Sequence, residues 1–507
     1  MALLQVKTEQ GIVEGMPAGN QAVSIFRGIP FAKAPVGDLR WRAPQPPDHW
    51  EGVRKAYTFA PIAMQERFSS EGGGNTLAAQ EFYCREYPMS EDCLYLNVWT
   101  PAESASEKLP VAIYFHGGAF ETGYSYLNAY DGEGFAKRGI IMVSVAYRLG
   151  VFGYLALPEL AEEDEEHHST GNYGTMDQIA AIQWIKRNVE AFGGDPSNIT
   201  LFGQSAGGLS VQNLCATPLV YGDFQHAIMQ SAGGLSKGGV PDHLTLEQAF
   251  LYGAEYKDQL HAATLEEARA LDAQTLIQAY SEMKGGPGYL EHYRPCVDGY
   301  VHPEPPDQYF RKGRHPDIDT MIGCTAAEFR QYGKPSPEYE EIQRMAKARY
   351  GAYAEQYLRA IHADQPELCQ PCFEDIIGDD VLASNLAWCE NQNLLGRKPA
   401  YLYYFTYVPP GAEKAHHSAE HHYVFQTLVR SKRPYTGFDY DLSNELADYW
   451  ANFMKTGNPN GGQETWTPFT EFAPKALIID RQRYMDIIPR RANVAFHVEF
   501  SLGKLLG

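Results

Sequence analysis

The sequence has no long apolar run and comparatively little positive charge. No stretch approaches the roughly 18 consecutive apolar residues of a membrane span. The opening residues, Met1–Lys7, contain neither a long apolar core nor a small-residue cleavage site. The 42 Lys and Arg face 63 Asp and Glu, a net charge of −21, which disfavours nucleic acids and anionic membranes as partners. We therefore expect a cytoplasmic protein, or a processed form whose leader was removed.

Cysteine is also scarce, since eight in 507 residues are too few for a disulfide scaffold. Cys369 and Cys372 form a CxxC pair, but it lacks the second pair of a zinc site and the strand-to-helix junction of a redox motif. Cys84 and Cys93 could close a short bridge, although reduced thiols are the default in a cytoplasmic protein. We expect no metal and no organic cofactor.

What the chain does contain is a large apolar share, 44%, in an order typical of alternating strands and helices. From Met176 to Phe192 apolar residues recur at helical spacing, and Gly193-Gly194 ends the run. In the first half of the chain the expected strands are Leu94–Trp99, Val111–Phe115, Ile140–Ala146, Ile199–Phe202 and Ala227–Met229. Such alternation predicts a mostly parallel sheet covered by helices on both faces.

The first 90 residues and the second half of the chain add other features. Short strands and turns over residues 1–60 predict an antiparallel edge of the sheet, and residues 62–90 have the mixed polarity of a long surface loop. Residues 240–290 and 335–395 are helix-like insertions, separated by strands at Thr320–Gly323 and Ala400–Phe405. Because the sequence contains no repeat and no Ser/Gly or Pro-rich linker, we predict a single domain over residues 1–507.

The most informative stretch is Gly203-Gln204-Ser205-Ala206-Gly207, between the strand Ile199–Phe202 and the helix-like run Leu209–Leu214. A serine flanked by glycines at a strand-to-helix turn is typical of the nucleophile elbow of a serine hydrolase. The glycines let the two backbones approach, so that the Ser205 hydroxyl stands clear of the sheet. The N–H of Ala206 opens the helix and is expected to face the charge that develops beside Ser205.

A second glycine turn, His116-Gly117-Gly118-Ala119-Phe120, follows directly on the strand Val111–Phe115. Glycines at this point allow backbone N–H groups to face inward at the carboxyl end of a parallel strand. We predict that the N–H groups of Gly118, Ala119 and Ala206 form an oxyanion hole.

Ordered motifs along nearly the whole chain resemble the type-B carboxylesterase and cholinesterase family, and in particular bacterial para-nitrobenzyl-esterase-like carboxylesterases. Besides the two glycine turns, they are Gly28–Ala32, Glu91–Asn97, Tyr147–Gly150, Gly171–Gly174, Asp177-Gln178, Phe192–Pro196 and Thr456–Asn460. The resemblance implies an α/β-hydrolase fold and the hydrolysis of carboxylic esters. It leaves the substrate open.

The base and its orienting acid also come from the resemblance, because composition does not choose among 16 histidines. The family's acid stands in a Gly-x4-Glu pattern, which here gives Glu328, and its histidine precedes Glu420 by three residues, which gives His417. His416 is the rival, one residue out of register. The implied roles are nucleophile for Ser205, base for His417 and orienting acid for Glu328.

Two residues depart from the family pattern. Gln204 stands where the family usually has glutamate, so the cleft has one negative charge fewer, which favours neutral, aromatic or short-acyl esters over choline esters. Phe329 follows Glu328 where the family commonly has glycine. We expect the bulk of Phe329 to shift the loop that holds the acid.

These observations predict a carboxylic ester hydrolase that acts on small ester substrates through an acyl-Ser205 intermediate. A non-catalytic binding protein of the same fold is the alternative from another class, and it is disfavoured because serine, acid, histidine and oxyanion turn are all present. An amidase or a lipase remains an alternative within the enzyme class.

Overall fold

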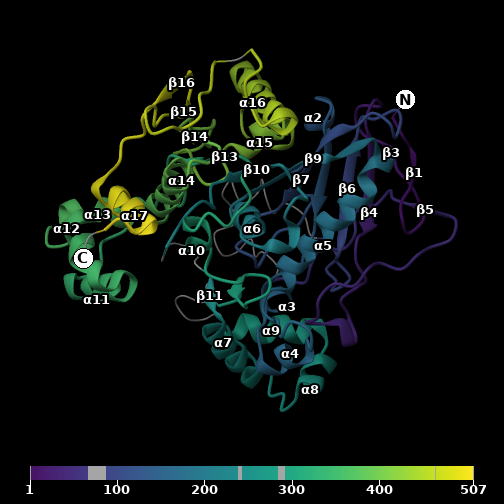
Figure 1. The fold of residues 1–507 in the computed structure, drawn as a ribbon, viewed down its shortest axis with the longest axis horizontal. Coiled ribbons are helices and arrows are strands. Elements are labelled where there is room, and N and C mark those ends of the chain that lie inside the picture. The colour runs from purple at the N-terminus through teal and green to yellow at the C-terminus, as the bar shows by residue number, and fades with distance from the viewer. Residues whose placement is uncertain (1, 67–86, 238–242, 284–291, 463, 506–507) are drawn as a thin grey trace.

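A mixed β-sheet forms the centre of the computed structural model, which describes residues 2–66, 87–237, 243–283, 292–462 and 464–505 (Figure 1). In order across the sheet, its strands in the described residues are β16 (Arg483–Asp486), β15 (Ala476–Ile479), β14 (Tyr401–Phe405), β13 (Asp319–Thr325), β10 (His226–Gln230), β9 (Gly194–Gln204), β7 (Leu109–Phe115), β8 (Ile141–Val145), β6 (Tyr95–Thr100), β4 (Ser24–Pro30) and β3 (Met16–Pro17). Neighbours from β8 to β15 are parallel, whereas β3, β4, β6 and β16 pair antiparallel.

The predicted mostly parallel sheet with an antiparallel N-terminal edge is therefore confirmed, and each strand expected from the sequence is present. The first strands depart from the simple edge, because β2 (Ile12–Glu14) pairs with β1 (Gln5–Lys7) on one side and with β5 (Val53–Lys55) on the other, in a small separate sheet. Of the predicted loop at residues 62–90, positions 67–86 lie outside the described residues, and so does Cys84. Cys93 is buried.

Strand alternation sends neighbouring side chains of the sheet into two different cores. In β7, Val111, Ile113 and Phe115 join the core on one face, while Ala112 and Tyr114 join the core on the other. This explains why the central strands read as unbroken apolar runs, since both faces are covered.

Helices cover both faces, as predicted. The first core includes side chains of α5 (Tyr173–Asn188), α6 (Ala206–Cys215) and α14 (Ile376–Leu394). The second includes side chains of α2 (Glu133–Ala136), α15 (His421–Val424) and α16 (Gly437–Thr456). Three further short helices are α3 (Gly150–Tyr154), α4 (Pro158–Glu163) and α10 (Pro306–Arg311).

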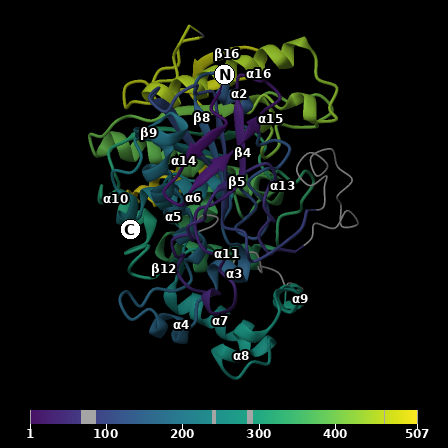
Figure 2. The same ribbon diagram turned by 90° about the vertical axis from the view of Figure 1, so that its right-hand side faces the viewer.

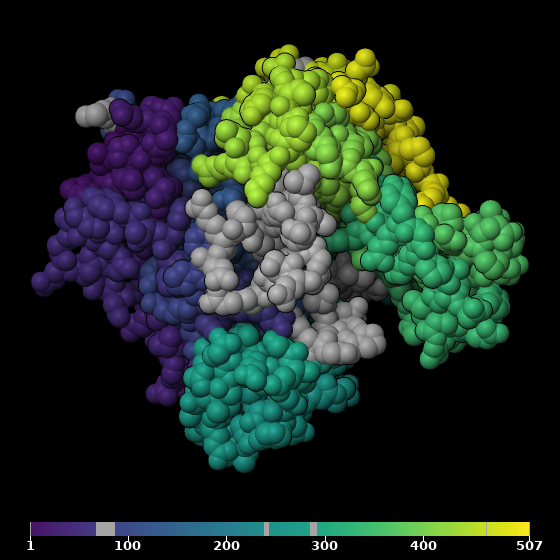
Figure 3. Space-filling view, turned by 180° about the vertical axis from the view of Figure 1, so that it is seen from behind, coloured from purple at the N-terminus to yellow at the C-terminus, as the bar shows by residue number. Residues whose placement is uncertain are grey.

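The helical insertions form two separate protrusions, teal and green in Figure 3. One holds α7 (Leu246–Gln259), α8 (Leu265–Ala270) and α9 (Ala273–Met283), with β11 (Leu244–Thr245) and β12 (Cys296–Val297) beside them. These helices lie at the opposite end of the molecule from α16 (Figures 1 and 2). The other, α11 (Tyr339–Tyr350), α12 (Ala354–Ala360) and α13 (Pro366–Glu374), shares a core with α17 (Ala492–Leu502).

Residues of the motifs that carry the family resemblance form two ion pairs in the scaffold. Arg148 binds Asp177 with two hydrogen bonds, at 2.8 and 2.7 Å, where both side chains are buried. Arg40 binds Glu91 in the same two-pronged way, with both bonds at 2.6 Å. Paired charges of this geometry fix the loops around the sheet, and removing one partner would leave the other buried and uncompensated.

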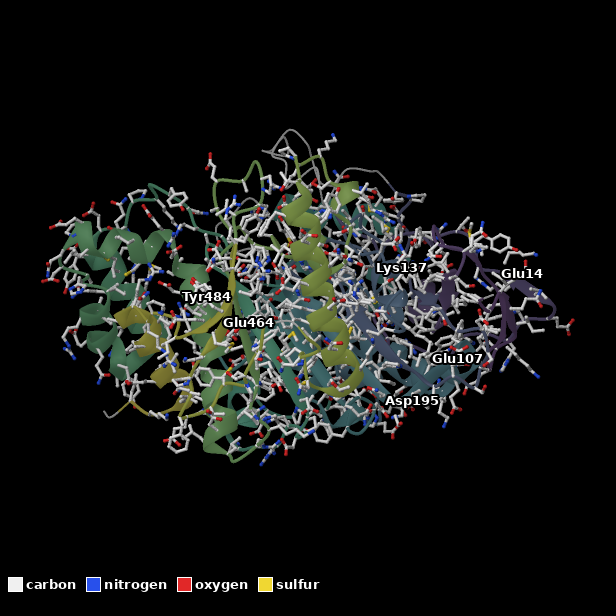
Figure 4. All side chains as sticks on the ribbon, turned by 90° about the horizontal axis from the view of Figure 1, so that it is seen from above. Glu14, Glu107, Lys137, Asp195, Glu464 and Tyr484 are labelled. Carbon is white, nitrogen blue, oxygen red and sulfur yellow. The ribbon has the colours of Figure 1, made fainter. Side chains whose placement is uncertain are left out.

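The acidic side chains Glu14, Glu107 and Asp195 lie at the periphery of the molecule (Figure 4). Over the described residues, no helix combines the length and the apolar character that a membrane crossing requires. Cys369 and Cys372 lie on α13, and burial raises the pKa of the Cys369 thiol to about 11, which keeps it protonated at neutral pH. The prediction of a single domain over residues 1–507 stays a prediction.

Candidate active site

Ser205 lies at the turn between β9 and α6 with φ 57° and ψ −131°, a conformation that non-glycine residues rarely adopt. Holding it there costs on the order of 1–3 kcal/mol. The turn closes only because its flanking residues have no side chain. A Cβ on Gly203 would lie 2.3 Å from the Gly207 carbonyl oxygen, and one on Gly207 would lie 2.0 Å from that of Phe115.

Backbone hydrogen bonds hold the turn in place. The Ser205 N–H donates to the Gln230 carbonyl at the end of the neighbouring strand β10, at 2.9 Å, and the Leu209 N–H donates to the Ser205 carbonyl, at 3.0 Å. Ala206 is the first residue of α6, so its N–H is among the four that the helix cannot pair internally. This N–H group is adjacent to the Ser205 side chain and carries the positive end of the helix dipole.

The glycine turn after β7 lies directly against Ser205, since a Cβ on Gly117 would come within 3.0 Å of the Ser205 Cβ. Gly118, Ala119 and Phe120 all have positive φ, at 116°, 57° and 63°. Within the described residues, the N–H groups of Gly118 and Ala119 make no hydrogen bond. The turn therefore presents two unpaired donors beside the serine.

His116, the first residue of this turn, is held in place by Tyr147. Its ring stacks on that of Tyr147 with 4.5 Å between centroids, and the Tyr147 hydroxyl donates to the His116 carbonyl at 2.8 Å. Burial lowers the pKa of His116 to about 4, so that the ring stays neutral at physiological pH.

Glu328 and His417 meet at the same edge of the sheet. Glu328 follows β13, and its Oε1 accepts a 2.7 Å hydrogen bond from the Thr325 N–H while its Oε2 contacts Nδ1 of His417. The carboxylate is buried, whereas the imidazole keeps 15% of its side-chain surface exposed. Glu328 therefore faces the histidine ring nitrogen that a triad acid would hold.

The loops that carry these two residues are joined through their backbones. The His417 N–H donates to the Glu328 carbonyl at 3.1 Å, and the Ala327 N–H donates to the Ala415 carbonyl at 3.1 Å. Because β13 and β14 are parallel neighbours, the loops after them meet at one edge. The strand order thus brings together residues about 90 positions apart.

His416, the rival from the sequence, points elsewhere. Its Nδ1 faces the carbonyl of His417 at 2.8 Å, and its Nε2 lies 3.1 Å from the Arg433 guanidinium. Of the two neighbouring histidines, His417 is the one whose ring contacts Glu328.

The Phe329 side chain packs against the imidazole of His417. Its ring centroid lies 4.1 Å from that of His417, while 46% of the residue is exposed. The bulk of Phe329 was expected to shift the loop that holds Glu328. The contact between Glu328 and Nδ1 of His417 is nevertheless present. Phe329 instead packs against the ring of His417.

Sequence reasoning missed two neighbours of His417. The Gln204 side chain is 2% exposed, and its amide nitrogen lies 3.0 Å from Nε2 of His417. Glu420, fully buried below the histidine loop, receives long hydrogen bonds from the Tyr403 hydroxyl and the Gln230 amide, at 3.3 and 3.5 Å. Burial, and then the charge of Glu328, raises the pKa of Glu420 to about 7.

A serine at a strained strand-to-helix turn, at the carboxyl edge of a mostly parallel sheet with helices on both faces, is the arrangement of an α/β hydrolase. A model of the Carboxylesterase family matches residues 2–497, and the chain belongs to this family. Membership makes the protein a carboxylic ester hydrolase.

Individual relatives agree with this assignment. The chain is 33% identical over 480 residues to fumonisin B1 esterase of Sphingopyxis macrogoltabida, which covers 91% of this chain and 83% of that one. It is 31% identical over 489 residues to para-nitrobenzyl esterase of Bacillus subtilis (strain 168), covering 94% and 95%. A solved structure of a PNB esterase superposes with a TM-score of 0.83 at 30% identity, covering 98% of this chain and 99% of that one.

Proposed function

We propose that this enzyme hydrolyses esters through an acyl intermediate on Ser205. His417 takes the hydroxyl proton of Ser205 as the oxygen attacks the ester carbonyl, then returns that proton to the leaving alcohol. Water, activated in the same way, releases the acid from Ser205. Glu328 holds the proton of His417 on Nδ1 and stabilises the imidazolium that forms.

The observation that carries this proposal is the contact between the buried Glu328 carboxylate and Nδ1 of His417, on the same sheet edge as the strained Ser205. A carboxylate on Nδ1 leaves Nε2 as the basic nitrogen, which is the tautomer that general-base catalysis needs.

The negative oxygen of the tetrahedral intermediate is assigned to three backbone donors, the N–H groups of Gly118, Ala119 and Ala206. The first two have no partner in the described residues, and the third opens α6. Each donor of this kind typically contributes about a hundred- to a thousandfold to the rate.

For the substrate we propose neutral esters, with an aromatic or short acyl or alcohol part. Gln204, which contacts the base, carries no charge where a carboxylate would attract a cationic alcohol. The relatives of this chain include an esterase named for the uncharged, aromatic para-nitrobenzyl group.

A matched pair of substrates tests both proposals. We expect phenyl acetate to be hydrolysed with a higher kcat/KM than acetylcholine, and neither to be hydrolysed by Ser205→Ala. Faster turnover of acetylcholine would refute the substrate proposal alone, whereas full activity of Ser205→Ala would refute the acyl-serine mechanism. Acetanilide and an emulsified long-chain ester, run beside phenyl acetate, distinguish an esterase from an amidase or a lipase.

The whole chain is proposed to fold as one domain, because its central sheet takes strands from β3 near one end to β16 near the other. Limited proteolysis tests this: cleaved chains that stay associated and unfold in one transition support one domain, and separable folded fragments contradict it.

A cytoplasmic location is proposed on the state of the thiols. Cys215, Cys296, Cys324 and Cys389 are buried free thiols, which suit a reducing compartment. Fractionation of the native host, with detection of the protein in the cytosolic or the exported fraction, decides the point.

A further inference from the structure

The side-chain amide of Gln204 is hydrogen-bonded to Nε2 of His417, the nitrogen that must accept the Ser205 proton in the proposed mechanism. Gln204 ends β9, immediately before Ser205, and its Nε2 lies 3.0 Å from Nε2 of His417. Its Oε1 points toward the glycine turn, since a Cβ on Gly117 would lie 3.4 Å from it. The side chain is thus packed between the base and the turn that carries the oxyanion donors.

The direction of this hydrogen bond follows from Glu328. A carboxylate accepts hydrogen bonds, so the imidazole proton lies on Nδ1, facing Glu328 Oε2. Nε2 then carries a lone pair, and the Gln204 amide must be the donor. The lone pair it binds is the one to which Ser205 must give its proton.

Within the described part of the chain, the Ser205 Oγ makes no hydrogen bond, although the residue is adjacent in sequence to Gln204. In the proposed mechanism the Ser205 hydroxyl must donate to this same lone pair, so it competes with the Gln204 amide, which holds the lone pair in this state.

We infer that Gln204 is a positioning residue that holds the base in a resting state, from which the Ser205 hydroxyl must displace it before acylation. This inference rests on the proposed roles of Ser205 and His417. The exchange replaces one neutral hydrogen bond by another, so it slows acylation without abolishing it.

The amide also suits the later stage, when Nε2 carries a proton. A glutamine that turns its Oε1 toward the ring accepts a hydrogen bond from the imidazolium, so it can serve both protonation states. A carboxylate at the same position could only accept, and it would favour the charged ring.

Other groups around His417 are the same whichever residue stands at position 204. Glu328 faces Nδ1, and Glu420 and His421 interact with His417 electrostatically from the start of α15 and the loop before it. His416 is the preceding residue and is bound by Arg433. A change confined to position 204 thus isolates the contribution of its amide.

The test is the rate at which a fluorophosphonate labels Ser205, followed by intact mass from pH 5 to 9. Gln204→Met keeps the length of the side chain and removes the donor, and we expect it to label about two- to tenfold faster than wild type at pH 8. For Gln204→Glu we expect the pH of half-maximal labelling to rise by about one unit or more. Gln178→Met is the matched control, because Gln178 is a buried glutamine whose amide donates to Ser210 at 2.8 Å, away from His417.

Labelling of Gln204→Met at or below the wild-type rate would overturn the inference. Should that variant fail to fold, an unchanged half-maximal pH for Gln204→Glu overturns it instead. An acceleration of labelling in Gln178→Met equal to that in Gln204→Met would also do so, since the effect would then reflect the loss of any buried amide. If wild type is not labelled at Ser205 at all, the proposed function itself fails, and the resting-state inference falls with it.

Discussion

Glu420 offers a test of the site that needs no substrate. Its carboxyl is fully buried, its Oε1 has the long hydrogen bonds described above, and its Oε2 has no partner within the described residues. Burial and the neighbouring Glu328 raise its pKa from 4.5 to about 7. The folded protein therefore binds this proton more tightly than the unfolded chain does.

The sign and size of the effect follow from linkage. An acid whose pKa is raised on folding favours the folded state fully below the unfolded pKa, and this advantage is lost as the pH rises through the folded pKa. At about 1.4 kcal/mol for each unit of pKa, the rise to about 7 corresponds to roughly 3 kcal/mol in total, of which about 2 kcal/mol is lost between pH 5 and pH 8. Glu420→Gln does not titrate and keeps the shape of the side chain.

We therefore expect Glu420→Gln to gain about 2 kcal/mol of unfolding free energy relative to wild type when the pH is raised from 5 to 8. Urea unfolding of both proteins at the two pH values measures this difference. The exposed Glu190→Gln serves as the control and should give the same difference from wild type at both. If the difference in unfolding free energy between Glu420→Gln and wild type is the same at both pH values, the reasoning is refuted. Glu420 would then have the same pKa in the folded and the unfolded protein.

Three further changes probe the geometry of the site. Gly207→Ala should abolish hydrolysis and lower the thermal midpoint, because its Cβ would lie 2.0 Å from the Phe115 carbonyl oxygen; an active variant of normal stability would show that the turn can relax. Glu328→Gln should lower kcat by roughly a thousand- to ten-thousandfold. Its oxygen would face the Thr325 N–H, at 2.7 Å in wild type, so the amide would donate to Nδ1 of His417 and move the ring proton to Nε2; near-normal kcat would contradict this. In wild type, kcat/KM should fall as the pH drops through the range in which His417 gains a proton, and a rate that is flat from pH 8 to 4 would exclude His417 as the base.

Much of the fold could be predicted because its signals are local. Unbroken apolar runs such as Val111–Phe115 indicate strands covered on both faces, and the structure buries that strand between two cores. Gly203 and Gly207 indicate that two backbones approach closely. The structure explains both glycines, because a Cβ at either position would collide with a backbone carbonyl oxygen. The separate small sheet of β1, β2 and β5 was missed, because β5 lies far along the chain from its partner β2 and such a pairing leaves no local pattern.

The side-chain contacts of the site could not be predicted in the same way. Gln204 and His417 are 213 residues apart, and their contact depends on the rotamer of a glutamine that the sequence marked only as a missing charge. The choice of His417 over His416 came from resemblance, and the contact with Glu328 supports it through geometry that spacing alone does not contain. The burial of Glu420 depends on β14 and β10, whose side chains Tyr403 and Gln230 surround it.

The most direct test of the central claim is the mass of the intact protein after exposure to a fluorophosphonate, with Ser205→Ala treated in parallel. We expect a single adduct on wild type, located at Ser205 by peptide mapping, and none on the folded variant. An adduct of equal amount on Ser205→Ala, or none on folded wild type, would contradict an acyl-serine mechanism at this residue.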